Sequence, residues 1–397
     1  MRRRRFLAGS AAALSLLTPL ARGVARAGLA DSGPVLDAGS TRVRVVPVAD
    51  GLVWPWDLAF LPDGDALLVT EAPGRLRIVR GNVLDPAPVW APPSPDGNDV
   101  LHGGVLHPRF EENRYVYVSY VKRALRGFTL AVARGRLDGN RLVGTHEIFV
   151  ADAWADRMHN VAGRMTFDAH DKLYVSVGDR DRLWATGDAR FRLRAQDLGN
   201  HVGKILRLTD DGGVPPDKPF VGRRGARPEV FAYGFRNGYG LAFHPETGEL
   251  WMADIGPLGG DELNVVAPGG NYGWPLVSAG LHYDGTPVEL AGTPPDHRPP
   301  ALAWVPAISP SSLAFYAGSR FPDWTGSLFV SALSGQQVQR IEVAGDGRAV
   351  RRESLLTELG LRFRVVAQGP DGNLYVATET AYGSGASDGT ILRIEPA

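Results

Sequence analysis

Polar, glycine-rich runs stand out in this 397-residue chain, because a hydrophobic core does not need them. One run contains His159, whose imidazole can be neutral near physiological pH and therefore suits a general base. Another contains Arg236-Asn237, and the planar guanidinium suits carboxylate oxygens. From the residues alone, a loop histidine without a role and an arginine paired with a neighbouring carboxylate remain the alternatives. The runs are residues 158–167, 178–180, 196–207, 233–241, 256–264 and 270–275.

Oxygen donors gather in the fifth of these runs. Calcium prefers carboxylates and backbone carbonyls, and turns such as Gly256-Pro257 expose carbonyls without obstruction by side chains. Asp261 and Glu262 follow with two carboxylates. The run predicts a calcium site, although the two acids could instead pair with nearby arginines.

Arg362 and Arg364 are two residues apart before Val365-Val366, so on a strand they project from the same face. Two like charges on one face are unfavourable, which indicates an anionic partner. A solvated edge strand is the alternative.

A repeated strand core positions these residues. Six times an aliphatic residue, a bulky residue, an aliphatic residue and a small residue follow one another. A short apolar stretch and a turn precede each copy and an apolar segment follows it, which is typical of antiparallel hairpins. The copies are residues 67–70, 116–119, 173–176, 250–253, 328–331 and 374–377.

Repeated antiparallel sheets of this size stack radially as blades of a propeller. The chain is therefore predicted to be all-β, a six-bladed β-propeller of four-stranded antiparallel blades. Residues 41–48 are expected to complete the last blade beside residues 390–396. Helical periodicity is scarce, and an irregular β-sandwich or a parallel β-helix are the less favoured alternatives.

Composition agrees with a single closed domain at residues 41–397. The chain has 43 basic and 43 acidic residues and no Cys. Balanced charge without a basic stripe predicts no nucleic-acid partner. The absence of Cys excludes disulfides, a Cys zinc site and a Cys nucleophile.

The N-terminus resembles an export signal. Four arginines precede Phe6-Leu7, a mild apolar run and Ala25-Arg26-Ala27, a small-x-small cleavage pattern. Residues 1–27 are predicted to be a signal of the twin-arginine type and residues 28–40 a short linker. An ordinary secretory signal or a retained anchor are the alternatives. We expect a periplasmic or secreted protein with no integral membrane segment in the mature chain.

From about Val53 to Pro396, the chain resembles the soluble, pyrroloquinoline-quinone-dependent aldose dehydrogenases of the glucose/sorbosone dehydrogenase family. The most specific pieces are Gly-Asp-Arg (178–180), Gln-Asp-Leu-Gly-Asn-His (196–201), Gly-Pro followed by Gly-Gly-Asp-Glu-Leu-Asn (256–264), and Asn-Tyr-Gly-Trp-Pro (271–275). The resemblance implies a six-bladed propeller with the quinone at one mouth, calcium beside it and an aldose above.

The resemblance also implies roles for individual residues. His159 would be the base that takes the proton of the sugar C1 hydroxyl, and Arg236 with Asn237 would bind the cofactor and stabilise negative charge on its oxygen. Arg362 and Arg364 would reach the cofactor carboxylates. Three residues separate His159 from Gly163-Arg164, a longer spacing than usual in the family, which a bulge could absorb.

Other cofactor contacts follow from position in the family pattern. Ser334, between Leu333 and Gly335, stands where some members have a cofactor-binding Lys, and Tyr283 resembles a Tyr that packs near the cofactor. Asn98 lies near the place of a cofactor-binding Gln that precedes Gly-Gly-Leu-Leu in the family.

The metal roles also come from the resemblance. The carbonyls of Gly256 and Pro257 would hold the calcium that bridges to the cofactor. Glu262 and the carbonyl of Tyr272 would hold a second, structural calcium.

The predicted function is oxidation of aldoses at C1 to the lactone with pyrroloquinoline quinone (PQQ) and Ca²⁺, with electrons passed to an acceptor that the sequence does not identify. Two alternatives stay open. One is a calcium-dependent hydrolase of the lactonase type. The other is a non-catalytic binding propeller that has kept the fold and lost the chemistry.

Overall fold

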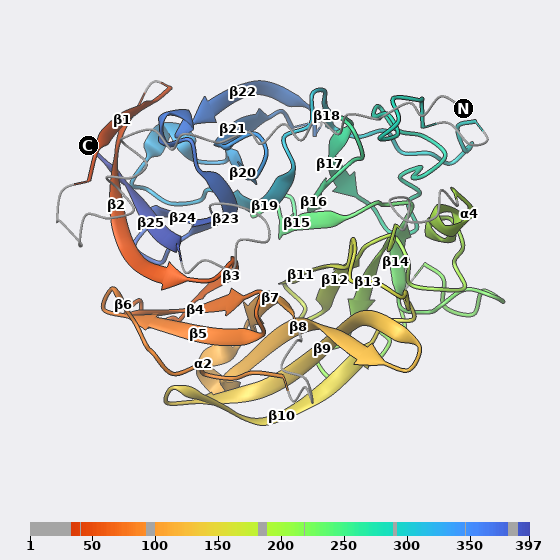
Figure 1. The fold of residues 1–397 in the computed structure, drawn as a ribbon, viewed down its shortest axis with the longest axis horizontal. Coiled ribbons are helices and arrows are strands. Elements are labelled where there is room, and N and C mark those ends of the chain that lie inside the picture. The colour runs from red at the N-terminus through yellow and green to blue at the C-terminus, as the bar shows by residue number, and fades with distance from the viewer. Residues whose placement is uncertain are drawn as a thin grey trace, which may run out of the picture.

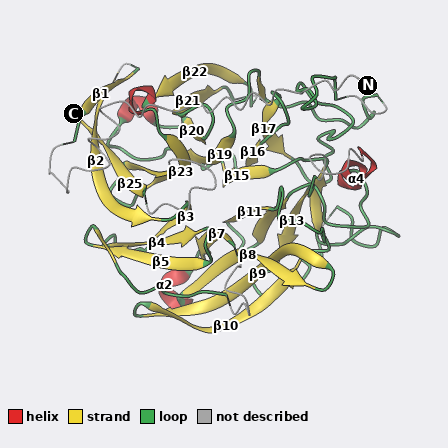
Figure 2. Ribbon diagram, viewed as in Figure 1, coloured by secondary structure: helices red, strands yellow, loops and turns green. Residues whose placement is uncertain are grey.

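The computed structural model describes residues 33–39, 41–92, 100–181, 189–217, 219–288, 292–345, 347–379 and 388–397. The predicted export signal and Asn98 lie outside these residues. Strands dominate the described chain (Figure 2). The helical elements are α2 (Phe110–Asn113), α4 (Ala189–Arg192) and the 3₁₀ turns η1 (Leu193–Ala195), η2 (Pro322–Trp324) and η3 (Thr357–Leu359).

The described strands form six antiparallel sheets around a central axis (Figure 1). We number these sheets blades 1 to 6 along the chain. Blade 1 contains β3 (Pro55–Phe60), β4 (Ala66–Glu71), β5 (Arg75–Arg80) and β6 (Val83–Leu84). Blade 2 contains β7 (Leu101–Leu106), β8 (Tyr115–Ala124), β9 (Gly127–Asp138) and β10 (Arg141–Val150). Blade 3 contains β11 (Ala162–Phe167), β12 (Leu173–Val177), β13 (Lys204–Leu208) and β14 (Val230–Tyr233).

Blade 4 contains β15 (Gly238–Phe243), β16 (Leu250–Asp254), β17 (Asp261–Val266) and β18 (Leu302–Trp304). Blade 5 contains β19 (Pro310–Phe315), β20 (Leu328–Ala332), β21 (Gln337–Val343) and β22 (Ala349–Leu355). Blade 6 contains β23 (Arg362–Gln368), β24 (Leu374–Glu379), β25 (Gly389–Pro396), β2 (Thr41–Leu52) and β1 (Val35–Ala38).

The first strands of the blades surround the axis. Each contacts the first strand of the next blade, and β23 contacts β3 to complete the ring. The prediction of a six-bladed propeller is therefore confirmed.

The N-terminal segment closes the ring, as expected. Strand β2 pairs antiparallel with β25, with Val45 opposite Ile394. The interpretation of residues 28–40 as a linker is wrong in part, because Val35–Ala38 form β1 and pair with β2. Leu36 and Ala38 of β1 are buried and Asp37 between them is exposed, as expected for an outer edge strand with one covered face.

The strand repeat is explained by packing between blades. All six copies lie on the second strands. In blade 2, Val116 and Val118 pack toward blade 1, whereas Tyr117 packs toward blade 3. The other five copies alternate in the same way, because successive side chains of a strand point to opposite faces. Each sheet therefore has two buried faces, and a hydrophobic cluster fills each interface between blades.

The small fourth residue of the repeat reaches the first strand of the next blade. The hydroxyls of Thr70, Ser119 and Ser176 donate to the carbonyls of His102, Gly163 and Gly238, at 2.5, 2.6 and 2.8 Å. A small residue is needed because the blades converge here. These hydrogen bonds tie together the strands that carry the site.

Candidate active site

The predicted site residues that the structure describes gather at one end of the ring, here named the site mouth. The first strand of each blade begins at this end. Arg236-Asn237 immediately precede the first strand β15, and Arg362 is the first residue of β23. The β16–β17 and β20–β21 connections lie at the same end, because antiparallel strands return to it. The turns between first and second strands lie at the other end, named the opposite mouth.

His159 lies on an exposed segment immediately before β11. The pairing of β11 with β12 shifts register between Ala162 and Met165. Asn160 and Ala162 have positive φ angles of 42° and 59°. A bulge is therefore present between His159 and the residues that follow Arg164.

Arg236 is a buried cation surrounded by oxygen atoms. Its Nη1 donates to the carbonyls of Ile255 and Gly256 at 3.0 and 2.7 Å, and its Nη2 donates to the hydroxyl of Tyr283 at 3.3 Å. Arg236 Nε and Asn237 Oδ1 are buried, and neither has a hydrogen-bond partner in the described part of the chain. These two atoms could therefore contact a ligand.

Asp254 fixes the backbone at Arg236 and Asn237. Its carboxylate accepts hydrogen bonds from both N–H groups, at 2.8 and 2.5 Å. Burial raises the pKa of Asp254 to about 7, although these N–H groups and the Arg236 guanidinium oppose the shift.

Asp179 joins the His159 segment to Arg236. Its carboxylate accepts hydrogen bonds from Asn160 Nδ2 and Trp274 Nε1, at 2.9 and 2.8 Å. Its N–H donates to the Arg236 carbonyl at 2.7 Å. Burial raises the pKa of Asp179 to about 6, and Arg236 limits this shift. Asp179 therefore links Asn160, the neighbour of His159, to the predicted site residue Arg236.

The Gly256–Asp261 loop is shaped by one carboxylate. Asp261 accepts the N–H of Gly256 at 2.8 Å and those of Ile308 and Ser309, both at 2.7 Å. The Asp261 carboxylate therefore binds main-chain N–H groups rather than the arginine considered from the sequence. Gly260 has φ of 67°, and a Cβ there would lie 2.3 Å from the nitrogen of Gly280, so the turn requires glycine.

Glu262 lies opposite Asp254 in the ladder of β16 and β17. Burial and the nearby Asp254 carboxylate raise the pKa of Glu262 to about 8. A cation would relieve this repulsion. Across the described ranges, no group of three or more His, Asp or Glu side chains could hold a metal ion, so a calcium here would depend on carbonyl oxygens.

Tyr272 offers only its carbonyl for such a role. Its ring stacks on Phe235 at 4.6 Å between centroids, and its hydroxyl donates to the Val265 carbonyl at 2.6 Å. The side chain belongs to the core between blades 3 and 4.

Arg362 and Arg364 share an internal carboxylate. Each donates through Nε and Nη2 to a different oxygen of Glu379, at 2.9 to 3.1 Å. The two side chains do project to one side, but Glu379 already neutralises one of the two charges. The charge argument for an external anion is therefore weaker than the sequence suggested, and the trio keeps one excess positive charge.

The segment Leu333-Ser334-Gly335 lies beside the loop that Asp261 holds. The hydroxyl of Ser334 is 2.8 Å from that of Ser309, and the N–H of Gly335 donates to the Ile308 carbonyl at 3.0 Å. Leu333 is buried and Ser334 is exposed. Tyr283 is 41% exposed and meets the site through the hydrogen bond from Arg236.

Comparison with known proteins shows the family of this chain. Residues 52–393 match the family described as Glucose / Sorbosone dehydrogenase. The chain belongs to the glucose/sorbosone dehydrogenase family. It is 35% identical to the aldose sugar dehydrogenase YliI of Escherichia coli strain K12, over 90% of this chain and 94% of the relative.

Solved structures place this glucose/sorbosone dehydrogenase in the same group. A glucose dehydrogenase is similar with a TM-score of 0.81 and 37% identity, covering 89% of this chain and 99% of that chain. The PQQ-bound form of aldose sugar dehydrogenase from Streptomyces coelicolor gives a TM-score of 0.70 at 27% identity, covering 90% and 99%. The chain is an oxidoreductase that acts on sugars. Among the residues described, no helix is both long and apolar enough to cross a membrane.

Sequence reasoning missed an axial cluster in this family member. Each first strand shifts register near its start. Trp56 stacks on His102 at 4.3 Å and meets the edge of Tyr239 at 4.7 Å, and Arg364 lies 5.0 Å from the Trp56 ring. Contacts between blades 1 and 4 are possible only at the axis. His102 immediately precedes Gly103-Gly104. The family pattern has Gln before its Gly-Gly pair, so the position of His102 was the sequence signal that could have located this cluster.

The residues at the site mouth fit the cofactors that the family implies. A tricarboxylated quinone needs excess positive charge and free polar atoms. The Arg362–Arg364–Glu379 trio, Arg236 Nε and Asn237 Oδ1 supply them. Carbonyl and carboxylate oxygens are the donors that calcium prefers.

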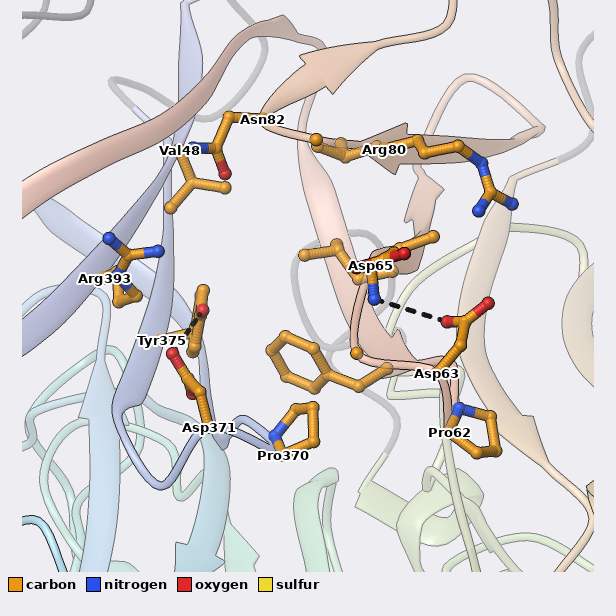
Figure 3. A pocket seen from close by; sticks show the side chains of 16 residues that line it. Val48, Pro62, Asp63, Asp65, Arg80, Asn82, Pro370, Asp371, Tyr375 and Arg393 are labelled. Atoms are coloured by element: carbon orange, nitrogen blue, oxygen red, sulfur yellow. Dashed lines mark hydrogen bonds between the residues drawn. The ribbon is translucent and has the colours of Figure 1, made fainter.

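A separate crevice lies at the opposite mouth, between blades 6 and 1 (Figure 3). Its volume is about 810 Å³, and Asp63, Arg80, Tyr375 and Arg393 are among its lining residues. None of the predicted site residues lines it.

Proposed function

We propose that this protein oxidises aldose sugars at C1 to the lactone, using PQQ and Ca²⁺, and passes the electrons to an external acceptor. One observation carries the proposal. Exposed His159 and buried Arg236 lie at one mouth, where Asp179 is hydrogen-bonded to Asn160, the residue after His159, and to the Arg236 carbonyl; Arg236 Nε and Asn237 Oδ1 have no hydrogen-bond partner among the described residues. The PQQ-bound aldose sugar dehydrogenase among the structural relatives supports the choice of cofactor.

The chain's own residues divide the work. His159 removes the proton of the C1 hydroxyl as a general base. Arg236 stabilises negative charge that develops beside it, from a buried and prearranged position. A bound quinone would supply the acceptor for the hydride that leaves C1. Arg362 and Arg364 hold the cofactor carboxylates, with further contacts from Asn98, Asn237, Tyr283 and the segment 333–335.

Two calcium sites complete the proposal. The carbonyls of Gly256 and Pro257 would hold one ion, and Glu262 with the Tyr272 carbonyl would hold a second, structural ion. Residues 1–27 direct export to the periplasm, where the aldose and the acceptor meet the enzyme.

The test is reconstitution of the purified chain with PQQ and Ca²⁺. We expect retained quinone absorbance after gel filtration and reduction of an artificial dye that depends on an aldose and is lost with a calcium chelator. Lactone hydrolysis with calcium alone, without bound quinone, would contradict the proposal and identify the protein as a hydrolase. Sugar binding without either activity would leave a binding propeller.

A further inference from the structure

The segment that bears His159 has little regular structure of its own. Residues 156–159 are exposed. Asn160, Ala162 and Gly163 have φ of 42°, 59° and 102°, which is unfavourable for the two residues that carry a Cβ. A loop of this kind would place an imidazole poorly unless other groups fixed its backbone.

Arg180 supplies such fixation. Its side chain is 1% exposed, and its guanidinium donates to four main-chain carbonyls. Arg157 and His159 accept at 2.7 and 2.6 Å, and Ala153 and Phe128 accept at 3.2 and 3.4 Å. Because Phe128 belongs to β9, this one side chain ties the segment 153–159 to blade 2.

The following carbonyls are held as well. The N–H groups of Arg180 and Gly178 donate to the carbonyls of Asn160 and Val161, at 3.4 and 3.1 Å. His102 Nδ1 lies 2.5 Å from the Ala162 carbonyl, and Ser119 Oγ donates to that of Gly163 at 2.6 Å. Every carbonyl from His159 to Gly163 therefore has a hydrogen-bond partner. We name this set, together with Arg180, the carbonyl ladder.

We infer that Arg180, through the carbonyl ladder, is the positioning residue for His159. The inference rests on the proposed role of His159 as base. A lysine cannot replace Arg180 here, because one ammonium nitrogen does not span four carbonyls that a planar guanidinium reaches with separate N–H groups. Release of the ladder leaves Arg236, Arg362 and Arg364 in place, so cofactor binding persists while proton removal suffers.

The experiment compares Arg180→Lys with Arg340→Lys, and trypsin provides a readout independent of activity. Arg340 is a matched control, because it is buried and donates to the Asp323 carbonyl, Ser327 and Glu353 at the opposite mouth. Native trypsin cleavage after Arg157, identified by a fragment that begins at Met158, should accelerate about tenfold in Arg180→Lys only. An unchanged rate in folded Arg180→Lys overturns the ladder.

Kinetics of the PQQ-loaded enzyme test positioning. Arg180→Lys should lower kcat about a hundredfold at unchanged PQQ affinity. It should also move the midpoint of the pH profile of kcat. Arg340→Lys should change neither kcat nor this midpoint. Faster cleavage with an unaltered kcat and pH profile would reduce Arg180 to a structural residue and overturn the inference.

Two further variants keep the outcomes distinct. Full activity of His159→Ala would refute the proposed base, while the trypsin result would still decide the ladder. If Arg180→Lys does not fold, Ser119→Ala removes a single donor from the same ladder and should show a smaller change in both readouts. No change in either readout would again overturn the inference.

Discussion

The two mouths of the propeller are built from the same strands but treat charge differently. At the opposite mouth, short turns carry exposed acids such as Asp63, which accepts a hydrogen bond from the nearby Asp65 N–H. At the site mouth, Arg236, Asp179, Asp254 and Arg364 are all buried. Water solvates the first set at little expense, whereas the second must be paired inside the protein.

The difference is informative about function. The site mouth contains buried carboxyl groups whose pKa values are raised, namely those of Asp179, Asp254 and Glu262. Such concentrations are typical of sites that do chemistry. The opposite mouth has crevices between blades but no comparable set among the described residues. We therefore expect substitutions at the site mouth to change turnover and matched substitutions at the opposite mouth to leave it intact.

The largest expected effect tests this comparison directly. His159→Ala should lower kcat by about 10²–10⁴-fold, because the base is lost while the cofactor residues remain. His170→Ala is the matched control, since His170 is an exposed histidine in the β11–β12 turn of the same blade. Steady-state dye reduction measures both variants. Equal activity of the two would break the comparison.

Removal of the buried cation comes next. Arg236→Gln leaves Asp179 and Asp254 without their guanidinium neighbour, and truncating a buried charge partner weakens binding by about 2–5 kcal/mol. We expect PQQ affinity to fall by that amount in fluorescence titrations. Arg340→Lys serves as control. Unaltered PQQ affinity in folded Arg236→Gln would remove Arg236 from the cofactor site.

A smaller effect is expected where two site segments meet at Gly178. A Cβ there would lie 1.9 Å from the Asn160 carbonyl oxygen and 3.0 Å from Asn237 Oδ1. Gly178→Ala should lower the free energy of unfolding by about 1–3 kcal/mol through overpacking. Gly345→Ala at the opposite mouth is the control, because a Cβ there meets no atom within 4 Å. Thermal unfolding compares them, and equal Tm values would contradict the close contact.

The smallest effect concerns pH and His102. Burial lowers the pKa of His102 to about 3, and the guanidinium groups of Arg364, Arg180 and Arg164 act in the same direction. The unfolded state, with an ordinary pKa near 6.5, therefore binds more protons between these values, and stability falls as pH falls through that window.

His102→Gln removes this dependence and can keep a donor to the Ala162 carbonyl. Between pH 7.5 and pH 5, the free energy of unfolding should fall by about 2 kcal/mol more in the wild type than in His102→Gln. Urea unfolding at both pH values measures the difference. Parallel pH curves for the two proteins would show that His102 does not titrate in this way.

Much of the fold was predictable because the strand repeat encodes packing on both faces. Tyr117 and its two valine neighbours occupy different interfaces between blades, and this alternation is readable from the sequence. The edge strand β1 was missed, since its four residues carry little pattern and depend on β2 for pairing.

The site was predictable only in part. The motifs located His159, Arg236 and the Gly256 loop on strand starts and turns, and the structure brings these to one mouth. Glu379 was not foreseen as the partner of Arg362 and Arg364, because ladder pairing of β23 with β24 brings it beside them. His102 and Trp56 were missed because register shifts, which carry no simple sequence signal, direct them to the axis.

The sequence by itself determined the six-fold repeat, the family and the types of side chain available for proton transfer, anion binding and calcium. Only the tertiary structure decided which of these groups meet. Ring closure brings residues from blades 1 and 4 into contact at the axis, and the carbonyl ladder fixes a segment whose own backbone angles are unfavourable. The local backbone conformation that a segment prefers is set by neighbouring residues. The meeting of site residues at one mouth depends instead on contacts between residues far apart in the chain.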